Sequence, residues 1–499
     1  MNGKKLKIAH IASEVDPFSK TGGLADVTSS LPKATKKLGH KIIVITPFYS
    51  EIIDSKSFKI IAENIDLELS KGITMKVNFW QGEMEKNLPI YFIENNQYFG
   101  RRKTLYGSEH ENARFFFFNL AALKLLEIIK FQPDVIHCHD WHSGLVPYFL
   151  KRRFNKNEFF KKTATTFTIH NLLFQFGHNW WKVRGKLRDD GNCRLPKFGH
   201  NPTIERINFA KRAIINADVI NAVSEQYAQE IITKNFGQDL HRILQNRKDK
   251  LFGIVNGIDY KDYNPKTDLG LEKNYDANSL NNKLENKKHI QKYFNLPANP
   301  DIPVLGMVTR IAEQKGFDLV LKIIEDILKL DIQFVIMGSG EKIYENFFKR
   351  IQKKYPKKVG IHLEFDAEKS TSVYAGTDMF LMPSRFEPCG LGQLISLRYG
   401  SIPIVRAVGG LVDTITDFNP KTKKGNGFVF HSYDSKALLV AIVRAVETYK
   451  YKDVWNDLVK KGMQQSFSWE IPAKKYIALY RKAIKNKEKG TKNNTILKE

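Results

Sequence analysis

Short apolar runs alternate with amphipathic stretches along the first half of the chain. Residues 7–12 form an apolar run, residues 24–38 follow with helical spacing, and residues 41–46 form the next apolar run. This order predicts a β-strand, an α-helix and a second β-strand parallel to the first. Three further apolar runs, each followed by a helical pattern, are residues 134–138, 164–169 and 218–222. The pattern predicts a parallel sheet covered by helices.

A turn-rich, polar stretch interrupts this alternation near the middle of the chain. After an apolar run at residues 251–255, the sequence Asn-Gly-Ile-Asp (256–259) leads into a segment rich in Asn and Lys that reaches about residue 300. Such a stretch is typical of a domain boundary. A second alternating series then begins, with apolar runs at residues 304–308, 333–337, 360–365, 379–382 and 402–405.

The two series predict an α/β protein of two doubly wound, Rossmann-like domains, residues 1–255 and 256–470. Residues 471–485 have the pattern of a final helix, and the polar, lysine-rich residues 486–499 are predicted to be a disordered tail. In doubly wound sheets ligands bind beyond the carboxyl ends of the strands, and two such domains facing each other make a deep cleft. Motifs directly after strands are therefore the candidates for function.

Composition narrows the class of protein. The chain has 499 residues, a formal net charge of +26 and three cysteines that are far apart in sequence. The lysines are scattered instead of forming a basic motif with interleaved aromatics, which disfavours nucleic acid as a partner. Residues 115–129 are the most apolar long stretch, but polar and charged residues interrupt them before the roughly 18 uncharged positions of a membrane span. We expect a cytoplasmic protein with no signal peptide, disulfide framework or membrane anchor.

The first candidate motif lies between the first strand and the first helix. Lys20 precedes Gly22 and Gly23 in the sequence Lys-Thr-Gly-Gly-Leu-Ala-Asp. Paired glycines let backbone amides approach an anion, the helix N-terminus adds positive potential, and the lysine adds a full charge. A Gly-Gly turn by itself is also a common tight connection, so the motif alone leaves both interpretations open.

The second candidate motif follows the first strand of the second domain. Arg310 and Lys315 place two cations five residues apart across a turn and a helix start. This spacing suits a diphosphate, because guanidinium makes bidentate contacts and ammonium supplies a point charge. In isolation the fragment more simply indicates a solvated loop that carries its usual Arg and Lys.

The third candidate motif follows the strand at residues 379–382. Glu387 lies at the carboxyl end of that strand, and Gly390, Leu391 and Gly392 open the next helix. A carboxylate there can accept hydrogen bonds from sugar hydroxyls, while the helix amides face a hydroxyl or phosphate. The alternative is a carboxylate that only caps the strand end, which the flanking proline and glycines disfavour.

Six motifs in order, including the three above, resemble the motif series of bacterial glycogen synthases and plant starch synthases. The other three are His-Cys-His-Asp-Trp-His (137–142), Thr-Ile-His-Asn-Leu (168–172) and Asn-Gly-Ile-Asp (256–259), and the resemblance covers residues 8–480. It implies a GT-B fold of two Rossmann-like domains and transfer of glucose from ADP-glucose, with UDP-glucose not excluded, to an α-1,4-glucan. It also implies retention of configuration and no metal or cofactor.

The resemblance also assigns roles residue by residue. It implies that His170 lies near the glucose 6-hydroxyl, that Asp140 lies on the acceptor side, and that Glu387 binds glucosyl hydroxyls. Arg310 and Lys315 would hold the diphosphate, and Lys20 with the Gly22 and Gly23 amides would face the donor from the first domain. The remaining donor-binding candidates are Asn171, Gln314, Phe365 beside the nucleobase, Gly390, Leu391 and Gly392.

The chain departs from the family pattern at a few positions. Gly392 and Val408 replace usual threonines, and Phe365 replaces a frequent tyrosine, which keeps ring stacking but removes a phenolic hydrogen bond. Trp180 and Trp181 stand where the family has a Gly- and Pro-containing turn. They are candidates for stacking on a glucan ring, although large aromatics more often pack a loop's own core.

Three alternatives remain to be weighed. His137, His139, Asp140 and His142 have the composition of a metal site, although the resemblance favours structural and acceptor-side roles. Another retaining GT-B transferase is disfavoured because many carry a second Glu eight positions after the first, where Ile395 stands here. A catalytically silent glucan-binding protein is disfavoured because it has no need to keep five charged or polar groups that are all present here: Lys20, His170, Arg310, Lys315 and Glu387.

Overall fold

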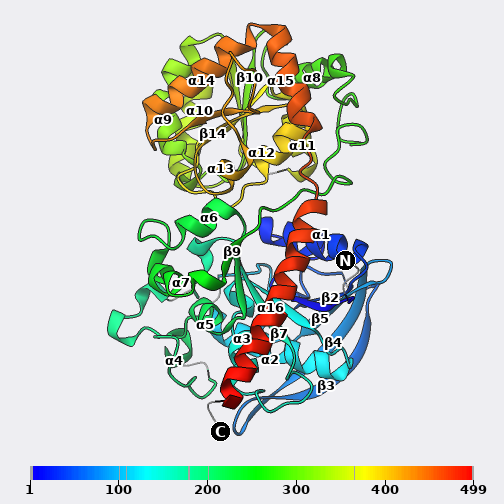
Figure 1. Ribbon diagram of the computed structural model, residues 1–499. Helices are drawn as coiled ribbons and strands as arrows, with labels where there is room; N and C mark the ends of the chain where they lie inside the picture. Colours follow the sequence, from blue (N-terminus) through cyan, green and yellow to red (C-terminus); the bar gives the residue numbers. More distant parts are fainter. Residues whose placement is uncertain are drawn as a thin grey trace. The chain divides into compact units, whose positions relative to one another are not determined.

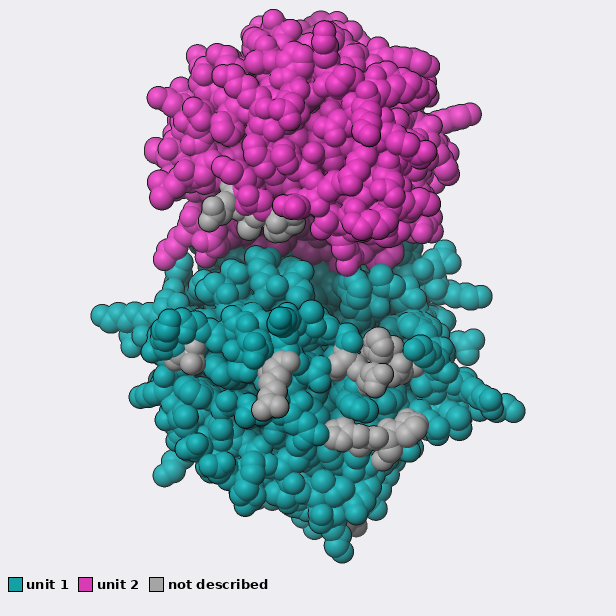
Figure 2. All heavy atoms as spheres, turned by 180° about the vertical axis from the view of Figure 1, so that it is seen from behind, with its two compact units in different colours: residues 1–256, 469–499 teal, residues 257–468 magenta. Residues whose placement is uncertain are grey.

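The computed structural model describes residues 4–54, 56–100, 102–107, 110–177, 180–199, 202–364 and 366–496. The chain divides into two compact units, which Figure 2 shows in separate colours. Unit 1 contains residues 1–256 and 469–499, and unit 2 contains residues 257–468. The chain therefore leaves unit 1 after residue 256 and returns to it at residue 469, just before its last helix begins.

The centre of unit 1 is a nine-stranded sheet. In spatial order its strands are β3 (Lys59–Ser70), β4 (Ile73–Glu85), β5 (Leu88–Glu94), β2 (Lys41–Pro47), β1 (Lys7–Ile11), β6 (Val135–His139), β7 (Ala164–Ile169), β8 (Val219–Ala222) and β9 (Leu251–Gly253). Neighbours from β5 to β9 are parallel, whereas β3 and β4 add an antiparallel edge. The order of the parallel strands reverses between β1 and β6, the place where doubly wound sheets bind ligands.

Helices cover this sheet. They are α1 (Gly23–Lys37), α2 (Glu111–Ile128), α3 (Val146–Arg152), α4 (Pro202–Glu205), α5 (Phe209–Asn216), α6 (Glu225–Glu230), α7 (His241–Gln245) and α16 (Glu470–Ile496). Helix α16 packs against α1 and along β6, β7 and β8 (Figure 1). Tyr476 and Tyr480 of α16 are fully buried there, in one apolar cluster with residues of α1 and the sheet.

The last helix is longer than the sequence predicts. The amphipathic pattern ends near residue 485, but α16 continues to Ile496 through residues expected to form a tail. Beyond that predicted end, the side chain of Asn486 donates a hydrogen bond to the backbone oxygen of Asp218, 3.0 Å away. A tertiary contact of this kind stabilises a helical turn that a polar sequence alone does not favour.

Unit 2 contains a six-stranded parallel sheet. In spatial order its strands are β12 (Val359–His362), β11 (Gln333–Met337), β10 (Val304–Val308), β13 (Met379–Met382), β14 (Ile402–Arg406) and β15 (Phe428–Phe430). Its helices are α8 (Lys283–Tyr293), α9 (Phe317–Lys329), α10 (Lys342–Lys354), α11 (Ala367–Gly376), α12 (Gly392–Arg398), α13 (Gly410–Thr414), α14 (Ser435–Tyr449) and α15 (Lys452–Gln464). The strand order is that of a Rossmann fold and reverses between β10 and β13.

The prediction of two α/β domains with parallel sheets is confirmed, and most predicted strands agree with the structure to within one or two residues. The sequence analysis missed the meander β3–β4–β5 and the short strand β15. Most side chains of β3 are exposed or half-buried. The strand therefore lacks the continuous apolar run that marks a buried parallel strand.

The sequence predicted neither a disulfide framework nor a membrane span, and the structure bears on both. Cys138, Cys193 and Cys389 are all free thiols. Within the described ranges, no helix is both long and apolar enough to cross a membrane.

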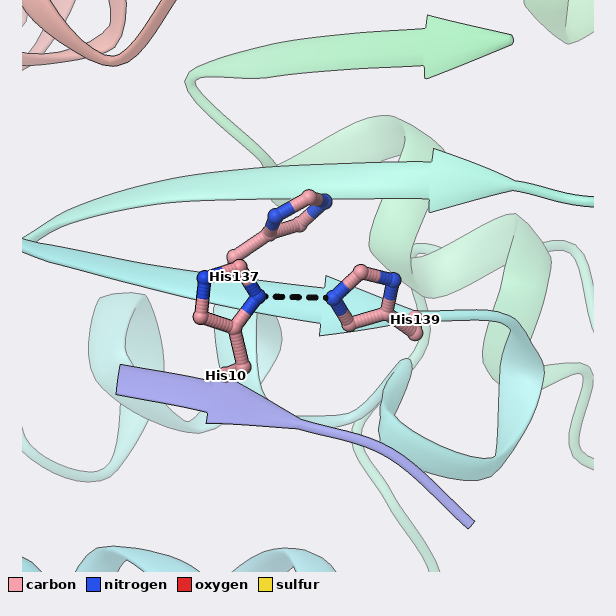
Figure 3. A group of neighbouring side chains, drawn as sticks. All are labelled: His10, His137 and His139. Atoms are coloured by element: carbon pink, nitrogen blue, oxygen red, sulfur yellow. Dashed lines mark hydrogen bonds between the residues drawn. The ribbon is translucent and has the colours of Figure 1, made fainter. Parts of the chain in front are cut away.

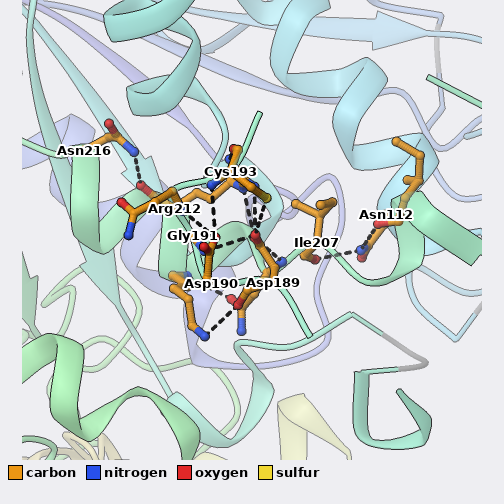
Figure 4. Close-up of polar contacts among 12 residues, drawn as sticks. Asn112, Asp189, Asp190, Gly191, Cys193, Ile207, Arg212 and Asn216 are labelled. Atoms are coloured by element: carbon orange, nitrogen blue, oxygen red, sulfur yellow. Dashed lines mark hydrogen bonds and ion pairs between the residues drawn. The ribbon is translucent and has the colours of Figure 1, made fainter. Parts of the chain in front are cut away.

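A buried ion pair anchors the loop before α5 (Figure 4). The guanidinium of Arg212 donates to both carboxylate oxygens of Asp189, at 2.7 and 2.8 Å, and to the backbone oxygen of Cys193 at 2.9 Å. Both charged side chains are fully buried. Because removing one partner leaves an uncompensated charge in the interior, we expect Arg212→Met to lower the free energy of unfolding by about 3–5 kcal/mol.

Chemical denaturation of the variant and the wild type would measure this loss. The matched control is Lys161→Met, because Lys161 pairs with Glu158 at 3.0 Å while both side chains are more than half exposed. Exposed pairs contribute about 0–1 kcal/mol, so the control should unfold close to the wild type. Equal midpoints for the two variants would contradict a stabilising role for the buried pair.

Candidate active site

In unit 1, the candidate residues lie beyond the carboxyl ends of three adjacent strands, β1, β6 and β7. Lys20, Gly22 and Gly23 follow β1, Asp140 follows β6, and His170 with Asn171 follows β7. The structure therefore brings these separate motifs to the same edge of the sheet, at the point where the strand order reverses. This edge is the expected place for a ligand.

The loop after β1 is held by a buried carboxylate. Glu14 is 3% exposed and accepts hydrogen bonds from both the backbone amide and the hydroxyl of Thr21. Tyr106 donates a further bond to Glu14 at 3.2 Å. Burial raises the pKa of Glu14, while these hydrogen bonds to the carboxylate oppose the shift. Glu14 thus fixes the turn that presents Gly22 and Gly23.

Lys20 is exposed and lies beside acidic groups of its own loop and helix. Its ammonium is 2.5 Å from the carboxylate of Asp26 and 3.7 Å from that of Asp16. Gly22 and Gly23 are also exposed, and α1 begins at Gly23. A ligand would have to compete with Asp26 for the ammonium and with Glu14 for the Gly22 amide, which also hydrogen-bonds that carboxylate.

Asp140 occupies a strained backbone position directly after β6. Its φ of 56° and ψ of 176° lie in a region that residues with a side chain rarely adopt. Its carboxylate accepts hydrogen bonds from the backbone amide of His170 at 2.8 Å and from the side chain of Gln175. Burial raises the pKa of Asp140 to about 7. Strain kept in place by several contacts is characteristic of functional sites.

His170 lies at one end of a row of hydrogen-bonded histidines. Its Nε2 is 3.0 Å from Nδ1 of His139, and Nε2 of His139 is 3.0 Å from Nδ1 of His10, as Figure 3 shows for the second contact. His170 is 9% exposed and the other two are fully buried. Burial lowers the pKa of His10 and of His170 to about 3 and that of His139 well below its usual value, so all three rings are neutral near pH 7.

The hydrogen bonds favour a network over a metal site in this region. His137 and His139 cluster with His10, and not with Asp140 and His142. One nitrogen of His137 pairs with the hydroxyl of Tyr480 at 2.8 Å and the other with that of Thr168 at 2.7 Å. Both nitrogens of His139 are also within hydrogen-bond distance of a neighbouring ring, so a metal ion would have to displace these hydrogen bonds.

The remaining candidates of unit 1 have mixed surroundings. Asn171 caps a short helical turn by accepting from the amide of Leu173 at 3.1 Å. Trp180 is buried, whereas Trp181 is 51% exposed, with the guanidinium of Arg188 5.3 Å from its ring centre. Trp180 therefore packs the loop, and only Trp181 offers surface to a ligand.

In unit 2, the candidate residues follow β10 and β13, on either side of the reversal in strand order. Lys315 and Glu387 form an ion pair with an N–O distance of 2.6 Å, and Glu387 is 6% exposed. Ser384 donates a hydrogen bond to the same carboxylate oxygen at 3.0 Å. Arg310 is exposed and donates to the side chain of Gln314 at 3.0 Å. Lys315 and Glu387 are thus brought together from loops that are distant in sequence, with Arg310 on the same loop as Lys315.

Close backbone contacts hold Glu387 in place. The amide of Gly410 donates to the backbone oxygen of Glu387 at 3.1 Å. Gly409 has a φ of 46°, and a Cβ atom there would lie 2.0 Å from the same oxygen. Gly390, Leu391 and Gly392 are half-buried, and α12 begins at Gly392, so its first amides point out of the helix start. Phe365, expected beside the nucleobase, lies outside the described residues.

The sequence analysis missed four groups that support the candidates: His10, Glu14, Gln175 and Ser384. Glu14 stands in the same loop as Lys20 and could have been considered, because a carboxylate in a short strand-to-helix connection often binds backbone amides. The other three act through contacts that only the folded chain reveals.

The chain matches two protein-family models and many known proteins. Residues 7–246 match the starch synthase catalytic domain, and residues 289–462 match glycosyl transferases group 1. A glycogen synthase from Pseudothermotoga lettingae is 42% identical, over 97% of this chain and 100% of the relative. A glycogen synthase from Bacillus anthracis is 41% identical, over 95% of this chain and 99% of the relative.

Solved structures agree with these relatives. The catalytic domain of starch synthase IV from Arabidopsis thaliana, bound to ADP and acarbose, is 33% identical, with a TM-score of 0.84 over 97% of this chain and 100% of that one. A sucrose-phosphate synthase from Thermosynechococcus elongatus, 19% identical with a TM-score of 0.59 over 96% of this chain and 98% of its own, shares the fold. The predicted GT-B class, with two Rossmann-like units, is confirmed.

Proposed function

This chain belongs to the glycogen synthase and starch synthase family of glycosyltransferases, and we propose that it transfers glucose from ADP-glucose to the non-reducing end of an α-1,4-glucan with retention of configuration. The similar glycogen synthases and the starch synthase structure bound to ADP and acarbose support this donor and this acceptor. UDP-glucose is the alternative donor. A cytoplasmic location stays a prediction from the sequence.

The residues of unit 2 suit the donor. Departure of a nucleoside diphosphate leaves negative charge on the leaving group and positive charge on the sugar ring. Arg310 and Lys315 stabilise the first charge, because preorganised cations act most strongly where charge develops. Glu387 accepts hydrogen bonds from the glucosyl hydroxyls and keeps Lys315 oriented through their 2.6 Å contact. Gln314 and the amides of Gly390, Leu391 and Gly392 complete the donor side of the proposal.

The residues of unit 1 suit the sugar and the acceptor. His170 binds the 6-hydroxyl of the transferred glucose, and Asp140 orients the loop that carries His170 through the hydrogen bond to its backbone amide. Lys20 and the exposed Gly22 and Gly23 amides face the donor. We assign no covalent nucleophile, in contrast to the paired carboxylates of retaining glycosidases.

One observation carries the proposal most directly. The pair of Lys315 and Glu387, with Arg310 on the same loop, lies at the reversal of strand order in a Rossmann-like sheet. At this position a partly buried cation can stabilise the leaving diphosphate, and a carboxylate can accept hydrogen bonds from the sugar hydroxyls.

The test is transfer of labelled glucose to glycogen from ADP-glucose and from UDP-glucose, measured side by side. We expect incorporation from ADP-glucose, and loss of incorporation in Glu387→Ala and Lys315→Ala. The wild-type protein failing to incorporate glucose from either donor, while still binding glycogen, would contradict the proposal and support a silent glucan-binding protein.

The pH profile should report on Asp140. Its pKa is raised to about 7 by burial, and the groups facing it are the His170 amide, Gln175 and the carboxylate of Glu14. If the ionised carboxylate holds the His170 loop, activity falls as the pH falls through about 7. The effect on stability has the opposite sign, because a raised folded-state pKa stabilises the fold at low pH and this contribution disappears as the pH rises through about 7.

Measuring kcat/KM from about pH 5 to pH 9 checks this prediction. The residual activity of Asp140→Asn should show no such acidic limb, because its side chain does not titrate. An acidic limb of the same position and slope in wild type and variant would show that another group titrates.

A further inference from the structure

His10, His139 and His170 form a row of hydrogen-bonded rings. His10 lies on β1 and His139 on β6, and these strands are parallel neighbours, with His10 in register with His137. His139 contacts His10 through Nε2 and His170 through Nδ1, both at 3.0 Å. Each contact joins two ring nitrogens, so one must carry the proton and the other must not.

All three rings are neutral, so each carries a single proton. The middle ring, His139, must therefore donate through one nitrogen and accept through the other. Only two states satisfy this condition: every ring carries its proton on Nδ1, or every ring carries it on Nε2. The geometry excludes mixed states, because they would place two protons or two lone pairs in one contact.

The two protonation states differ at His10, the buried end of the row of histidines. Nε2 of His10 is fully buried and has no hydrogen-bond partner among the residues that the structure describes. With Nε2 protonated throughout, this atom would be an unpaired buried N–H donor. With Nδ1 protonated throughout, it is an unpaired acceptor. Among backbone groups, a buried N–H without a partner is rarer than a carbonyl oxygen with an unused lone pair, and by analogy the Nδ1 state is favoured here.

We propose that His10 and His139 are positioning residues that fix the tautomer of His170, so that His170 presents a protonated Nδ1 to the substrate hydroxyl. The ring of His170 then acts as a hydrogen-bond donor, and the hydroxyl that it binds is the acceptor. This inference rests on the proposed role of His170 in binding the transferred sugar. It adds the direction of that hydrogen bond and the two buried residues that set it.

Two substitutions at His139 separate the contacts. The amide nitrogen of an Asn side chain takes the place of a histidine Nδ1, so His139→Asn keeps a donor to His170 and loses the contact with His10. The end of a Gln side chain takes the place of Nε2, so His139→Gln keeps the contact with His10 and loses the donor to His170. Each variant loses one buried hydrogen bond, so comparing the two controls for that loss.

We expect His139→Asn to keep kcat within about threefold of the wild type and His139→Gln to lower it about 10- to 100-fold, by analogy with residues that orient a catalytic histidine. The KM for glycogen should change little in either variant. Equal kcat values for the two variants would overturn the proposal. His170→Ala tests the proposed function separately, because full activity in that variant would refute the role of His170 itself.

A spectroscopic measurement reads the tautomer directly. In protein labelled with ¹⁵N in histidine, long-range ¹H–¹⁵N correlation distinguishes protonated from unprotonated ring nitrogens. We expect His10, His139 and His170 each to show a protonated Nδ1 and an unprotonated Nε2, with His170 losing this state in His139→Gln. His137→Gln removes a buried ring that packs on His139, with ring centres 3.9 Å apart, but whose hydrogen bonds go to Tyr480 and Thr168, so it should leave the His170 signals in place. A protonated Nε2 on His170 in the wild type would overturn the proposal.

Discussion

Replacing Lys315 by Ala is expected to lower kcat by about 10²–10³-fold, the usual loss when one preorganised charge-stabilising group is removed. The substitution removes two functions of Lys315 at once. Its ammonium no longer stabilises the departing diphosphate, and Glu387, only 6% exposed, loses the cation 2.6 Å from its carboxylate. Steady-state kinetics with ADP-glucose and glycogen measure the loss. The fold should persist, because Ser384 still donates to the Glu387 carboxylate.

The matched control is Lys342→Ala. Lys342 also forms an ion pair at 2.6 Å, with Glu345, but its side chain is 82% exposed and lies at the start of α10. This variant should retain wild-type kcat. A comparable loss in both variants would show that any removed ion pair in unit 2 damages the enzyme, and would contradict a specific role for Lys315.

The double variant Lys315→Ala/Glu387→Ala sharpens the argument. If the two residues act as one unit, the double variant should lose little more than the more damaged single variant, because groups that work together are not additive. Losses that multiply would indicate independent roles, with Lys315 acting on the diphosphate alone and Glu387 on the sugar alone. This cycle therefore tests the contact itself, which the sequence did not predict.

The sequence predicted the sheets because buried parallel strands are nearly continuous apolar runs. The strands on either side of both reversal points, β1, β6, β10 and β13, were all found within one residue or so of their true bounds. The loops that follow them were found as well, since glycines and charged residues directly after an apolar run stand out. The positions of Arg310, Lys315 and Glu387 at the sheet edge follow from this pattern alone.

The contacts between those loops could not be predicted. Lys315 and Glu387 are 72 residues apart, and nothing in either motif shows that the ammonium lies on the carboxylate instead of pointing to solvent. His10 is 129 residues from His139 and stands in an apolar strand, where a single histidine most simply packs in the core. Their pairing depends on strand register, and register is a property of the folded sheet.

The exposure of individual side chains could not be predicted from the sequence either. Trp180 and Trp181 are adjacent and of the same type, yet one is buried and the other is 51% exposed. Asp140 appeared as one polar residue in a histidine-rich motif. Its positive φ, its contact with the His170 amide and its raised pKa emerge only when β6 and β7 lie side by side.

Replacing Gly409 by Ala is expected to abolish most of the activity by moving Glu387, although residue 409 needs no contact with substrate. A Cβ atom at this position would lie 2.0 Å from the backbone oxygen of Glu387, and φ is 46°, a conformation unfavourable for alanine. The backbone of Glu387 must therefore move, and a displacement of about 1 Å in a positioned group costs on the order of 10²-fold in rate. Steady-state kinetics on a variant whose folding is verified by circular dichroism measure this loss.

Gly185→Ala is the matched control, because a Cβ atom at residue 185 would meet no other atom within 4 Å. It should keep wild-type kinetics, whereas Gly409→Ala should also lower the midpoint of unfolding, since the new methyl group meets backbone that cannot rotate away. A folded Gly409→Ala variant with wild-type kcat would show that the Glu387 loop tolerates displacement. In that case the charge of Glu387, and not its exact position, would be what the reaction requires.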